Sequence, residues 1–433
     1  MKDKFIVRGG KPLYGKIKIS GAKNSASKLL IASLLTDEEV KITNSPNLIS
    51  EMKVAKEICT AIGTKFKKFR GDEIIVQTKS IHATSFSPEL GIINRLGILT
   101  VGPLLNRVGE AKIPKLGGDK IGARPINFHL DGLSKLGVKI KEYKNFYLLK
   151  ARKLLGCQII MPYPSVGATE NIILSSVLAE GKTTVNNAAT EPEIIDLIMM
   201  LQKMGAIIDV LPSREIVITG VEKLNGTNHR VIPDRIEAAS FACAAIASKG
   251  DITLIDARQD DMITFLNSVR LIGADYEIQE NGIRFFYKKK LKSINIETDV
   301  HPGFMTDWQP PMTILLTQSH GTSTVHESVY ENRFGYINEL KKMGADIEMT
   351  HDCLGKLCRF YGTDYQHSVI INGPTKLKCS NIVVPDIRAG FSYLVAAILA
   401  KGESTVNGIH YIDRGYEKIE EKMRMLGVEI ERA

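Results

Sequence analysis

The residues best suited to chemistry in this chain are cations placed where a helix should begin. The ordinary residue at a helix N-terminus is acidic or a small cap, because the positive end of the helix dipole lies there. Repeated cations at this position indicate that helix N-termini and basic groups point together at an anion. The cations of this kind are Lys23, Arg95, Arg124, Arg235, Arg333, Arg388 and Arg414.

Acidic residues stand among these cations and are candidate proton donors and acceptors. Asp119 lies in the glycine-rich stretch KLGGDKIGARP (115–125), Asp307 in HPGFMTDWQPP and Asp386 in PDIRAG. On position alone Asp307 is the best general-base candidate, whereas Asp386 has the place of an ordinary helix N-cap. Glycines around charged residues are typical of active-site lids, so we expect the stretch 115–125 to be a mobile loop. A mobile insertion without function is the alternative.

The composition limits the other functions open to the chain. Its 433 residues are 44% hydrophobic and 24% charged, so it can bury a core and is not disordered. The net charge of +9 raises the possibility of nucleic-acid binding, but the basic residues are dispersed and form no readout motif. We therefore expect no nucleic-acid partner. A small multi-anionic ligand is the favoured use of the charge, with a solvated basic surface as the alternative.

The cysteines predict neither a disulfide framework nor a metal site. The six are scattered, with no CxxC pair and no histidine partners at zinc spacing. No apolar run approaches the ~20 residues that span a bilayer, and the opening MKDKFIVRGG has no apolar signal segment. We expect a cytoplasmic protein with reduced thiols, no membrane association and no metal.

An internal repeat defines the elements that position these residues. Each copy has an apolar helix-like run, a tight turn and a β-rich run, as in LSSVLAEGKTTV and LVAAILAKGESTV. Each copy predicts a buried helix, a strand, an amphipathic helix ending at glycine, and two further strands. The sixth copy has an extra segment between Thr350 and Cys379, which we interpret as a surface elaboration. The glycines that end the amphipathic helices are Gly63, Gly137, Gly205, Gly273, Gly344 and Gly427.

The repeats predict two domains of three repeats each. The last repeat stops one strand short at GVEIERA, and residues 1–20 resemble the missing strands. We therefore expect 1–20 to complete the C-terminal domain (230–433), which holds the general base. Residues 21–229 form the other domain, which holds the loop 115–125. The chain would cross between the domains twice and leave a cleft.

The chain resembles the UDP-N-acetylglucosamine enolpyruvyl transferase family over nearly its whole length. The sister shikimate-pathway family shares the six-repeat architecture, but its characteristic opening and glycine-rich stretches are not found here. The resemblance implies two inside-out α/β barrel-like domains, each of three βαβαββ-type repeats, joined by a double crossover with the active site in the cleft. The matching stretches are SGAKNSA (20–26), GGDKIGARP (117–125), SVGATE (165–170), EPEI (191–194), PDRIEA (233–238), TDWQ (306–309), ENRF (331–334), DIRAG (386–390) and IDRGYE (412–417).

The resemblance also implies a reaction. The enolpyruvyl group of phosphoenolpyruvate would be transferred to the 3-hydroxyl of UDP-N-acetylglucosamine by addition and elimination, with release of phosphate. This step belongs to cytoplasmic peptidoglycan precursor synthesis. The implied partners are these two small molecules, and no metal or organic cofactor is expected.

Residue roles follow from the same resemblance. Asp307 would take the proton of the acceptor hydroxyl. Lys23, Arg124 and Arg414 would hold the phosphate, and Arg333 with Arg414 the carboxylate. Asp386 and Arg388 would tie the closed loop to the other domain. The implied nucleotide-sugar contacts are Asn24, Arg95, Pro125, Ile126, Asn127, Phe128, Ser165, Val166, Gly167 and Val329.

The chain departs from the family pattern at three places. Asp119 stands where a cysteine is usual, so its carboxyl is the implied proton donor, and fosfomycin, which alkylates that cysteine, should not inactivate the protein. Asn127 replaces a usual aspartate, and Tyr163 and Pro164 stand near a missing lysine. These changes leave open another nucleotide or nucleotide-sugar acceptor. A non-catalytic paralogue that only binds nucleotide sugar is disfavoured because the residues of the reaction itself are kept.

Overall fold

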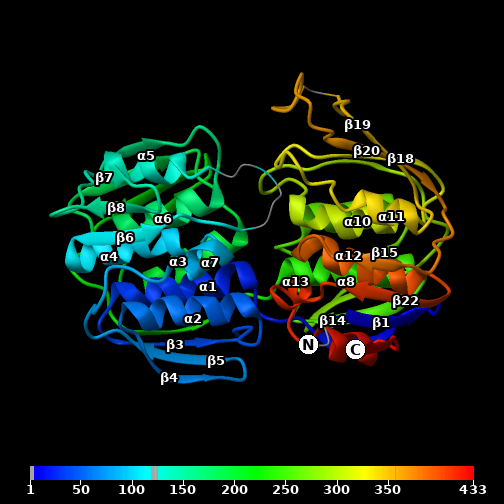
Figure 1. Ribbon diagram of the computed structural model, residues 1–433, viewed down its shortest axis with the longest axis horizontal. Coiled ribbons are helices and arrows are strands. Elements are labelled where there is room, and N and C mark those ends of the chain that lie inside the picture. Colours follow the sequence, from blue (N-terminus) through cyan, green and yellow to red (C-terminus); the bar gives the residue numbers. More distant parts are fainter. Residues whose placement is uncertain (1–3, 119–121, 123–124, 356) are drawn as a thin grey trace. The chain divides into compact units, whose positions relative to one another are not determined.

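The chain folds into two compact units. The computed structural model describes residues 4–118, 122, 125–355 and 357–433. The boundaries between the units fall after Ser20 and after Ile232. Figure 1 shows the helices and strands of each unit. The repeats in the sequence predict these boundaries after residues 20 and 229. Unit 1 contains residues 4–20, Gly122 and the described residues from 233 to 433, and unit 2 contains the other described residues.

Unit 2 is built on three small sheets. Their strand orders are β13-β3-β5-β4, β6-β8-β7 and β11-β12-β10-β9. The strands are β3 (Glu39–Thr43), β4 (Lys65–Arg70), β5 (Glu73–Gln77), β6 (Glu110–Pro114), β7 (Lys139–Glu142), β8 (Phe146–Lys150), β9 (Gln158–Ile160), β10 (Lys182–Asn186), β11 (Ile207–Leu211), β12 (Glu215–Thr219) and β13 (Thr227–Arg230).

Unit 1 has the same plan. Its sheets have the orders β15-β16-β14-β2, β17-β18-β20-β19 and β21-β22-β1-β23. The strands are β1 (Lys4–Gly9), β2 (Tyr14–Lys18), β14 (Asp251–Ile255), β15 (Asp275–Gln279), β16 (Gly282–Phe286), β17 (Asn295–Glu297), β18 (Gly321–His326), β19 (Asp346–Thr350), β20 (Ser368–Gly373), β21 (Asn381–Val383), β22 (Gly402–Asn407) and β23 (Glu429–Arg432).

The repeats exchange strands. In unit 2, β9 pairs in parallel with β10 of the next repeat, and β13 returns to pair with β3 of the first. In unit 1, β17 pairs with β18, β21 with β22 and the N-terminal β2 with β14. The other N-terminal strand, β1, lies between β22 and β23 of the last repeat. The two N-terminal strands therefore serve two different sheets.

Helices fill the interior of each unit and cover part of its outside. Those of unit 2 are α1 (Lys23–Ala32), η1 (Ser33–Leu35), α2 (Ser50–Ile62), α3 (Pro88–Ile93), η2 (Leu96–Thr100), α4 (Val101–Val108), α5 (Asn127–Lys135), α6 (Val166–Ser176) and α7 (Pro192–Lys203). Those of unit 1 are α8 (Arg235–Ala247), α9 (Ile263–Leu271), η3 (Thr306–Trp308), α10 (Gln309–Leu316), α11 (Ile337–Lys342), α12 (Ile387–Leu399), α13 (His410–Asp413) and α14 (Ile419–Met425).

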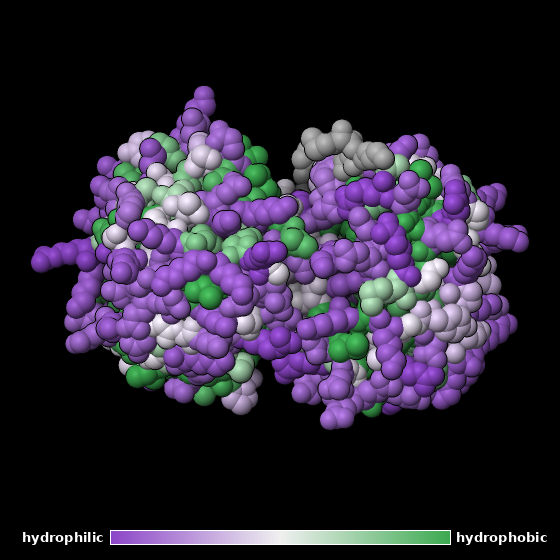
Figure 2. All heavy atoms as spheres, turned by 90° about the horizontal axis from the view of Figure 1, so that it is seen from below, coloured by the Kyte–Doolittle hydropathy of each residue, from purple (hydrophilic) through white to green (hydrophobic). Residues whose placement is uncertain are grey.

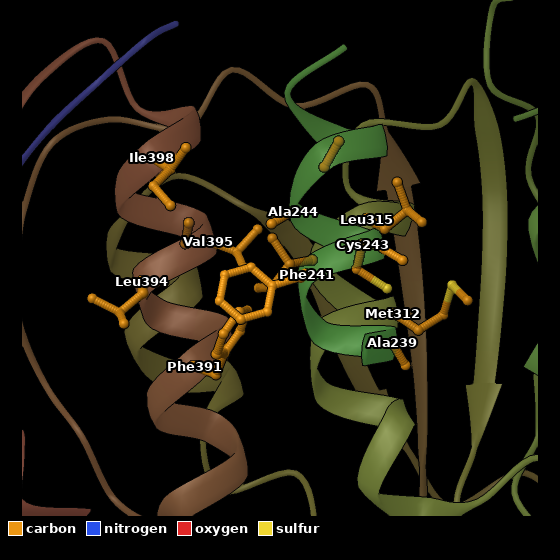
Figure 3. Close-up of a cluster of buried hydrophobic side chains, with 14 of the residues drawn as sticks. Ala239, Phe241, Cys243, Ala244, Met312, Leu315, Phe391, Leu394, Val395 and Ile398 are labelled. Carbon is orange, nitrogen blue, oxygen red and sulfur yellow. The ribbon is translucent and has the colours of Figure 1, made fainter. Parts of the chain in front are cut away.

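The first helix of each repeat in unit 1 lies in the core, as predicted from its apolar sequence. Every residue of α8 and α10 is buried, and α12 is buried over nearly its whole length. Figure 3 shows side chains of these three helices packed together. Phe241 and Phe391 meet edge to face, with ring centroids 5.0 Å apart. A helix that is apolar all round needs such burial on all sides, which explains why the helices lie inside and the sheets outside.

The predicted glycine stops are confirmed. The six repeat glycines all have positive φ, from +88° at Gly344 and Gly427 to +130° at Gly63. Side chains disfavour this left-handed region, so glycine is the residue that lets a helix end and the chain reverse into the next strand.

The face drawn in Figure 2 is mainly polar. Figure 2 shows hydrophilic residues over most of the visible face of each unit, with apolar residues in small groups. Over the described ranges, no helix combines the length and apolar character needed to cross a membrane.

Candidate active site

A carboxylate held by two arginines lies at the helix N-termini of unit 1. Asp307 is in η3, directly before the buried helix α10. Its Oδ1 accepts a hydrogen bond from Arg333 Nη2 at 2.8 Å, and its Oδ2 accepts one from Arg388 Nε at 3.1 Å. Both arginine side chains are buried, whereas the aspartate keeps partial exposure. The general-base candidate is thus fixed in orientation from both oxygens.

Asp386 orients the second of these arginines. Its Oδ1 accepts from the backbone N–H groups of Arg388 and Ala389, at 2.9 and 3.1 Å, and so caps α12 as predicted. The same oxygen lies 4.0 Å from Arg333 Nη1. The N-cap therefore also contributes negative charge beside the buried guanidinium, and four predicted site residues form one cluster.

The acidic groups of this cluster stabilise the charged forms of its two arginines. Burial acts to lower the pKa of Arg333, but Asp307, Asp386 and Glu327 together raise it above its ordinary value. Burial also acts to lower the pKa of Arg388, but Asp307, Tyr416 and Asp234 together raise it above its ordinary value. Over the described part of the chain, Arg333 Nε and Arg388 Nη1 are buried without a hydrogen-bond partner. Each arginine thus keeps one nitrogen whose hydrogens no described protein atom accepts.

Glu327 shapes the loop that follows β18 and was not predicted from the sequence. Its Oε1 accepts from the backbone N–H groups of Val329 and Tyr330, at 2.9 and 3.0 Å. Its Oε2 accepts from the Thr306 hydroxyl at 2.9 Å. Burial raises the pKa of Glu327, and Arg333 opposes this shift. The carboxylate connects the loop of Val329 to the residue before Asp307.

Two further cations lie near helix ends in unit 1. Arg235 is the first residue of α8, and its backbone carbonyl accepts a hydrogen bond from Trp308 Nε1 at 3.3 Å. Its guanidinium lies 5.4 Å from the centre of the Trp308 ring. Arg414 is half-buried and follows the short helix α13, rather than starting a helix as predicted.

The N-terminus of α1 holds the corresponding cation in unit 2. Lys23 is the first residue of this helix, and its Nζ lies 3.2 Å from Glu51 Oε2, with both side chains almost fully buried. Asn24 is the next residue and is half-buried. The partner Glu51 comes from the first turn of α2. Its sequence position is that of an ordinary acidic residue in a first turn, which is why the sequence did not single it out.

A buried polar network anchors the start of α1. Ser25 Oγ donates a short hydrogen bond to Asp196 Oδ2, and Asp196 Oδ1 lies 2.8 Å from His229 Nε2. The backbone N–H of Ile232 also donates to Asp196, at 3.4 Å. The serine bonds the carboxylate and not the histidine, so this trio has no geometry for a nucleophile. It connects α1 to α7 and β13.

Arg95 and the start of α6 lie near one buried histidine. Burial lowers the pKa of His129 to about 3, and the charge of Arg95 adds to the shift. A Cβ atom at Gly167 would lie 3.3 Å from the His129 ring. Ser165 caps α6 by accepting from the Ala168 N–H, and Val166 is the first residue of the helix. Arg95, the α6 cap and α5, which carries His129, are therefore neighbours in unit 2.

The remaining predicted residues lie around the start of α5. Pro125 is exposed and Ile126 is the N-cap of the helix, which begins at Asn127. Asn127 is exposed and Phe128 is half-buried. Asp119 and Arg124 lie outside the described residues.

A set of potential metal ligands lies elsewhere in unit 1. His326, Cys353, Cys358 and His367 each offer one ligand atom, and these four atoms lie within 4.8 Å of one another. The set contains no CxxC pair, so the cysteine spacing in the sequence does not predict it. The available signal was a C-x4-C spacing at 353–358 with a histidine following, but His326 comes from an earlier strand.

The sequence of this chain is similar to those of known transferases. The model of the EPSP synthase family (3-phosphoshikimate 1-carboxyvinyltransferase) matches residues 7–423. The UDP-N-acetylglucosamine 1-carboxyvinyltransferase of Protochlamydia amoebophila (strain UWE25) is 47% identical over 438 residues, which cover 99% of this chain and 94% of that relative. The protein of the same name from Chlamydia abortus (strain DSM 27085 / S26/3) is 45% identical, and the match covers 98% of this chain and 97% of the relative.

The solved structures agree on the fold. The enolpyruvyl transferase NikO from Streptomyces tendae superposes with a TM-score of 0.87 at 21% identity, covering 100% of this chain and 99% of that one. The predicted fold class is confirmed by this likeness.

Proposed function

We propose, because the chain belongs to the EPSP synthase family and among its members to the UDP-N-acetylglucosamine 1-carboxyvinyltransferases, that it acts on phosphoenolpyruvate and UDP-N-acetylglucosamine. It is an enzyme of the carboxyvinyltransferase kind. The enolpyruvyl group would pass to the 3-hydroxyl of the sugar, and phosphate would leave. The reaction would take place in the cytoplasm, as the first committed step of peptidoglycan precursor synthesis.

The cluster around Asp307 carries this proposal. Addition of a hydroxyl to an enol requires a base for the hydroxyl proton and an acid for the vinyl carbon. Both Asp307 oxygens are held by buried arginines, so the carboxylate keeps a constant orientation toward a bound hydroxyl. In the proposed first step, the hydroxyl oxygen bonds to C2 of phosphoenolpyruvate while C3 gains a proton. In the second step C3 loses a proton and the C2–O bond to phosphate breaks.

Cations complete the proposed site. Lys23, Arg124 and Arg414 would bind the phosphate, and Arg333 with Arg414 the carboxylate of phosphoenolpyruvate. Such groups stabilise the charge that develops in the transition state without changing their own protonation. The buried Arg333 N–H group that has no partner among the described residues supports a role in anion binding. Asp119, in the loop 115–125, is the proposed acid.

The nucleotide end would be bound by unit 2 and by the Val329 loop. The proposed contacts in unit 2 are Asn24, Arg95, Pro125, Ile126, Asn127, Phe128, Ser165, Val166 and Gly167. The support is local: Ser165, Val166 and Gly167 form the N-terminus of α6, and backbone N–H groups at such an end favour anionic groups. In unit 1, Glu327 holds the Val329 loop in one conformation. The charge of Asp386 and the α12 cap would keep Arg388 in place.

A different acceptor is the second candidate. Asn127 and the Tyr163–Pro164 pair replace residues that the family uses near the nucleotide, so the preferred acceptor could be another nucleotide or nucleotide sugar. A binding protein without catalysis is the weaker alternative, because it would have no use for a base held by two arginines.

The test is phosphate release from phosphoenolpyruvate with and without UDP-N-acetylglucosamine, combined with mass detection of the adduct. Acceptor-dependent release and a product heavier by the enolpyruvyl group are expected. Phosphate release with UDP-glucose or UMP, but not with UDP-N-acetylglucosamine, would instead establish a different acceptor. Absence of release with all three acceptors, in protein that binds UDP-N-acetylglucosamine, would contradict catalysis.

A further inference from the structure

Two histidines and two cysteines gather at one end of the β17–β20 sheet. His326 is the last residue of β18, and His367 directly precedes β20. Cys353 and Cys358 lie in the segment between β19 and β20, which projects from this sheet (Figure 1). Ligand atoms of all four lie within 4.8 Å of one another. None of these residues belongs to the proposed catalytic set.

Two of the distances within this set match those between ligands of one metal ion. Cys353 Sγ lies 3.7 Å from Cys358 Sγ and 3.5 Å from His367 Nε2. Tetrahedral zinc, with Zn–S bonds of about 2.3 Å and Zn–N bonds of about 2.05 Å, places two sulfurs about 3.8 Å apart and a sulfur and a nitrogen about 3.5 Å apart. A disulfide needs about 2.05 Å between sulfurs, and both cysteines are free thiols.

Hydrogen bonds fix both imidazoles with Nε2 available as a ligand. The Ser368 hydroxyl donates its one hydrogen to the Asp352 carbonyl at 2.5 Å, so it must accept from His326 Nδ1 at 2.8 Å. His367 Nδ1 lies 2.8 Å from the Tyr365 carbonyl, which can only accept. Each Nε2 therefore carries a lone pair. Within the described residues, His326 Nε2 is buried with no hydrogen-bond partner. Histidines that bind metals are oriented in this way.

A backbone donor and an aromatic ring line the cluster. The backbone N–H of Phe360 donates to Cys358 Sγ at 3.3 Å, and such a bond stabilises negative charge on sulfur. The Phe360 side chain is buried, and its ring centre lies 5.9 Å from that of His367. The ring therefore covers one side of the cluster.

The segment that bears the cysteines has little else to order it. Among its described residues from 351 to 366, Phe360 alone is buried, whereas Leu357 and Tyr361 are more than 60% exposed. Fixing the backbone of each residue costs about 1–2 kcal/mol of conformational entropy. A segment of this length without an apolar core needs a cross-link to hold one conformation.

We propose that His326, Cys353, Cys358 and His367 bind one zinc ion in a structural site. Two thiolates and two imidazoles in tetrahedral array select zinc over harder cations such as magnesium or calcium. The protein occupies all four positions, which leaves none for water or substrate, so the ion has a structural and not a catalytic role. It pins the segment between β19 and β20 to the end of β18. The sequence-based expectation of no metal is thereby replaced.

The test is metal analysis of the full-length protein, purified without a histidine tag. Elemental mass spectrometry should find about one zinc per chain. Replacing zinc by Co²⁺ should give thiolate-to-cobalt charge-transfer bands and the d–d absorption of a tetrahedral site.

The double variant C353S/C358S should lose at least nine-tenths of the metal, whereas the matched double variant C157S/C379S should keep it. Ser368→Ala should weaken zinc binding by about 10–100-fold, because His326 loses its orienting acceptor.

Hydrogen exchange can be measured on the wild-type protein, so misfolding of a variant cannot affect the result. Chelation should speed exchange in residues 351–367 and leave the core helices protected. Several results would overturn the proposal: no zinc in the purified protein and none after dialysis against Zn²⁺, wild-type zinc content in C353S/C358S, or a Cys353–Cys358 disulfide in protein handled under reducing conditions. Iron or copper bound in place of zinc would overturn the assignment of the ion. None of these readouts depends on transferase activity.

Discussion

The buried guanidinium of Arg333 donates to Oδ1 of Asp307 at 2.8 Å, and this pair joins the loop after β18 to the N-terminus of α10. Because the second oxygen of Asp307 is held by Arg388, the carboxylate has no freedom to rotate away from a bound hydroxyl. Orientation and proton acceptance are therefore provided by the same few atoms.

Asp307→Asn tests this arrangement. The amide keeps the shape of the side chain but cannot take a proton, so kcat should fall by about 10²–10⁴-fold while binding of the nucleotide sugar changes little. Steady-state kinetics and calorimetric titration measure the two quantities. The exposed Asp346→Asn on β19 is the control and should behave as the wild type. Unchanged turnover in Asp307→Asn would show that the base is another residue.

Asp119 predicts resistance to fosfomycin. If Asp119 takes the place of the family's usual cysteine, as proposed, the drug meets a carboxyl where it would otherwise alkylate a thiol. Incubation with the drug should cause no time-dependent loss of activity and no covalent adduct by intact mass. The variant D119C supplies the missing thiol and should gain both. An adduct on the wild-type protein would count against the prediction, and its site would follow from peptide mapping.

Glu170 predicts a pH dependence of stability. Burial raises the pKa of this α6 residue to about 7; Lys28 opposes the shift, and nearby carboxylates such as Glu193 add to it. The ordinary pKa is 4.5, so between pH 4.5 and 7 the folded chain retains a proton that the unfolded chain has lost. Stability is greatest below this window and falls as pH rises through it, by up to about 3 kcal/mol.

The variant Glu170→Gln is neutral at every pH and should escape this loss. Its denaturation midpoint, relative to that of the wild type, should rise from pH 5 to pH 8 and then stay constant. A difference between the two proteins that does not vary with pH would mean that Glu170 titrates normally in the folded state.

Ser25→Ala tests the buried network under α1. Without the hydroxyl, the buried Asp196 carboxylate loses one donor, which should cost about 1–3 kcal/mol in the free energy of unfolding. Ser27 lies in the same helix and is equally buried, but it donates at 3.3 Å to the backbone carbonyl of Lys23. The control Ser27→Ala should therefore cost less than about 1 kcal/mol. Equal losses in urea unfolding would refute a special role for Ser25.

Arg359 connects the proposed zinc segment to the proposed acceptor site. Its Nη2 donates to the Val329 carbonyl at 2.6 Å and lies 3.7 Å from Glu331. Arg359→Ala should raise KM for the nucleotide sugar about three- to tenfold, with kcat and zinc content unchanged. The surface control Arg8→Ala removes an exposed pair with Glu403 and should alter neither constant. A loss of zinc in Arg359→Ala would show that this residue acts on the metal cluster itself.

The repeat pattern made the elements predictable, because an apolar helix and a glycine stop are local signals. The burial of α8 and the positive φ of Gly205 follow from such signals. The pairing of β13 with β3 does not follow from local signals, because strand pairing between distant repeats depends on how the whole unit closes. The same holds for the cluster of His326 with Cys353, whose members come from separate strands and segments of one sheet.

The sequence predicted the kinds of residue in the candidate site but not the hydrogen bonds between them. Cations at helix starts identified Arg333 and Arg388 from their unusual position. Their shared partner Asp307 could be ranked as a base, but its two hydrogen bonds depend on packing between α10, α12 and the loop after β18. Glu327 carried no signal, because a buried glutamate that accepts from backbone N–H groups looks like any surface acid in a sequence.

The pairing of the N-terminal strands has a consequence for synthesis on the ribosome. All strand partners within unit 2 lie between residues 21 and 232, so this unit can complete its sheets while the rest of the chain is still being translated. The strand β2 must wait for β14, and β1 must wait for β22 and β23 near the C-terminus. Strands made before unit 2 thus find their partners only after unit 2 has been made.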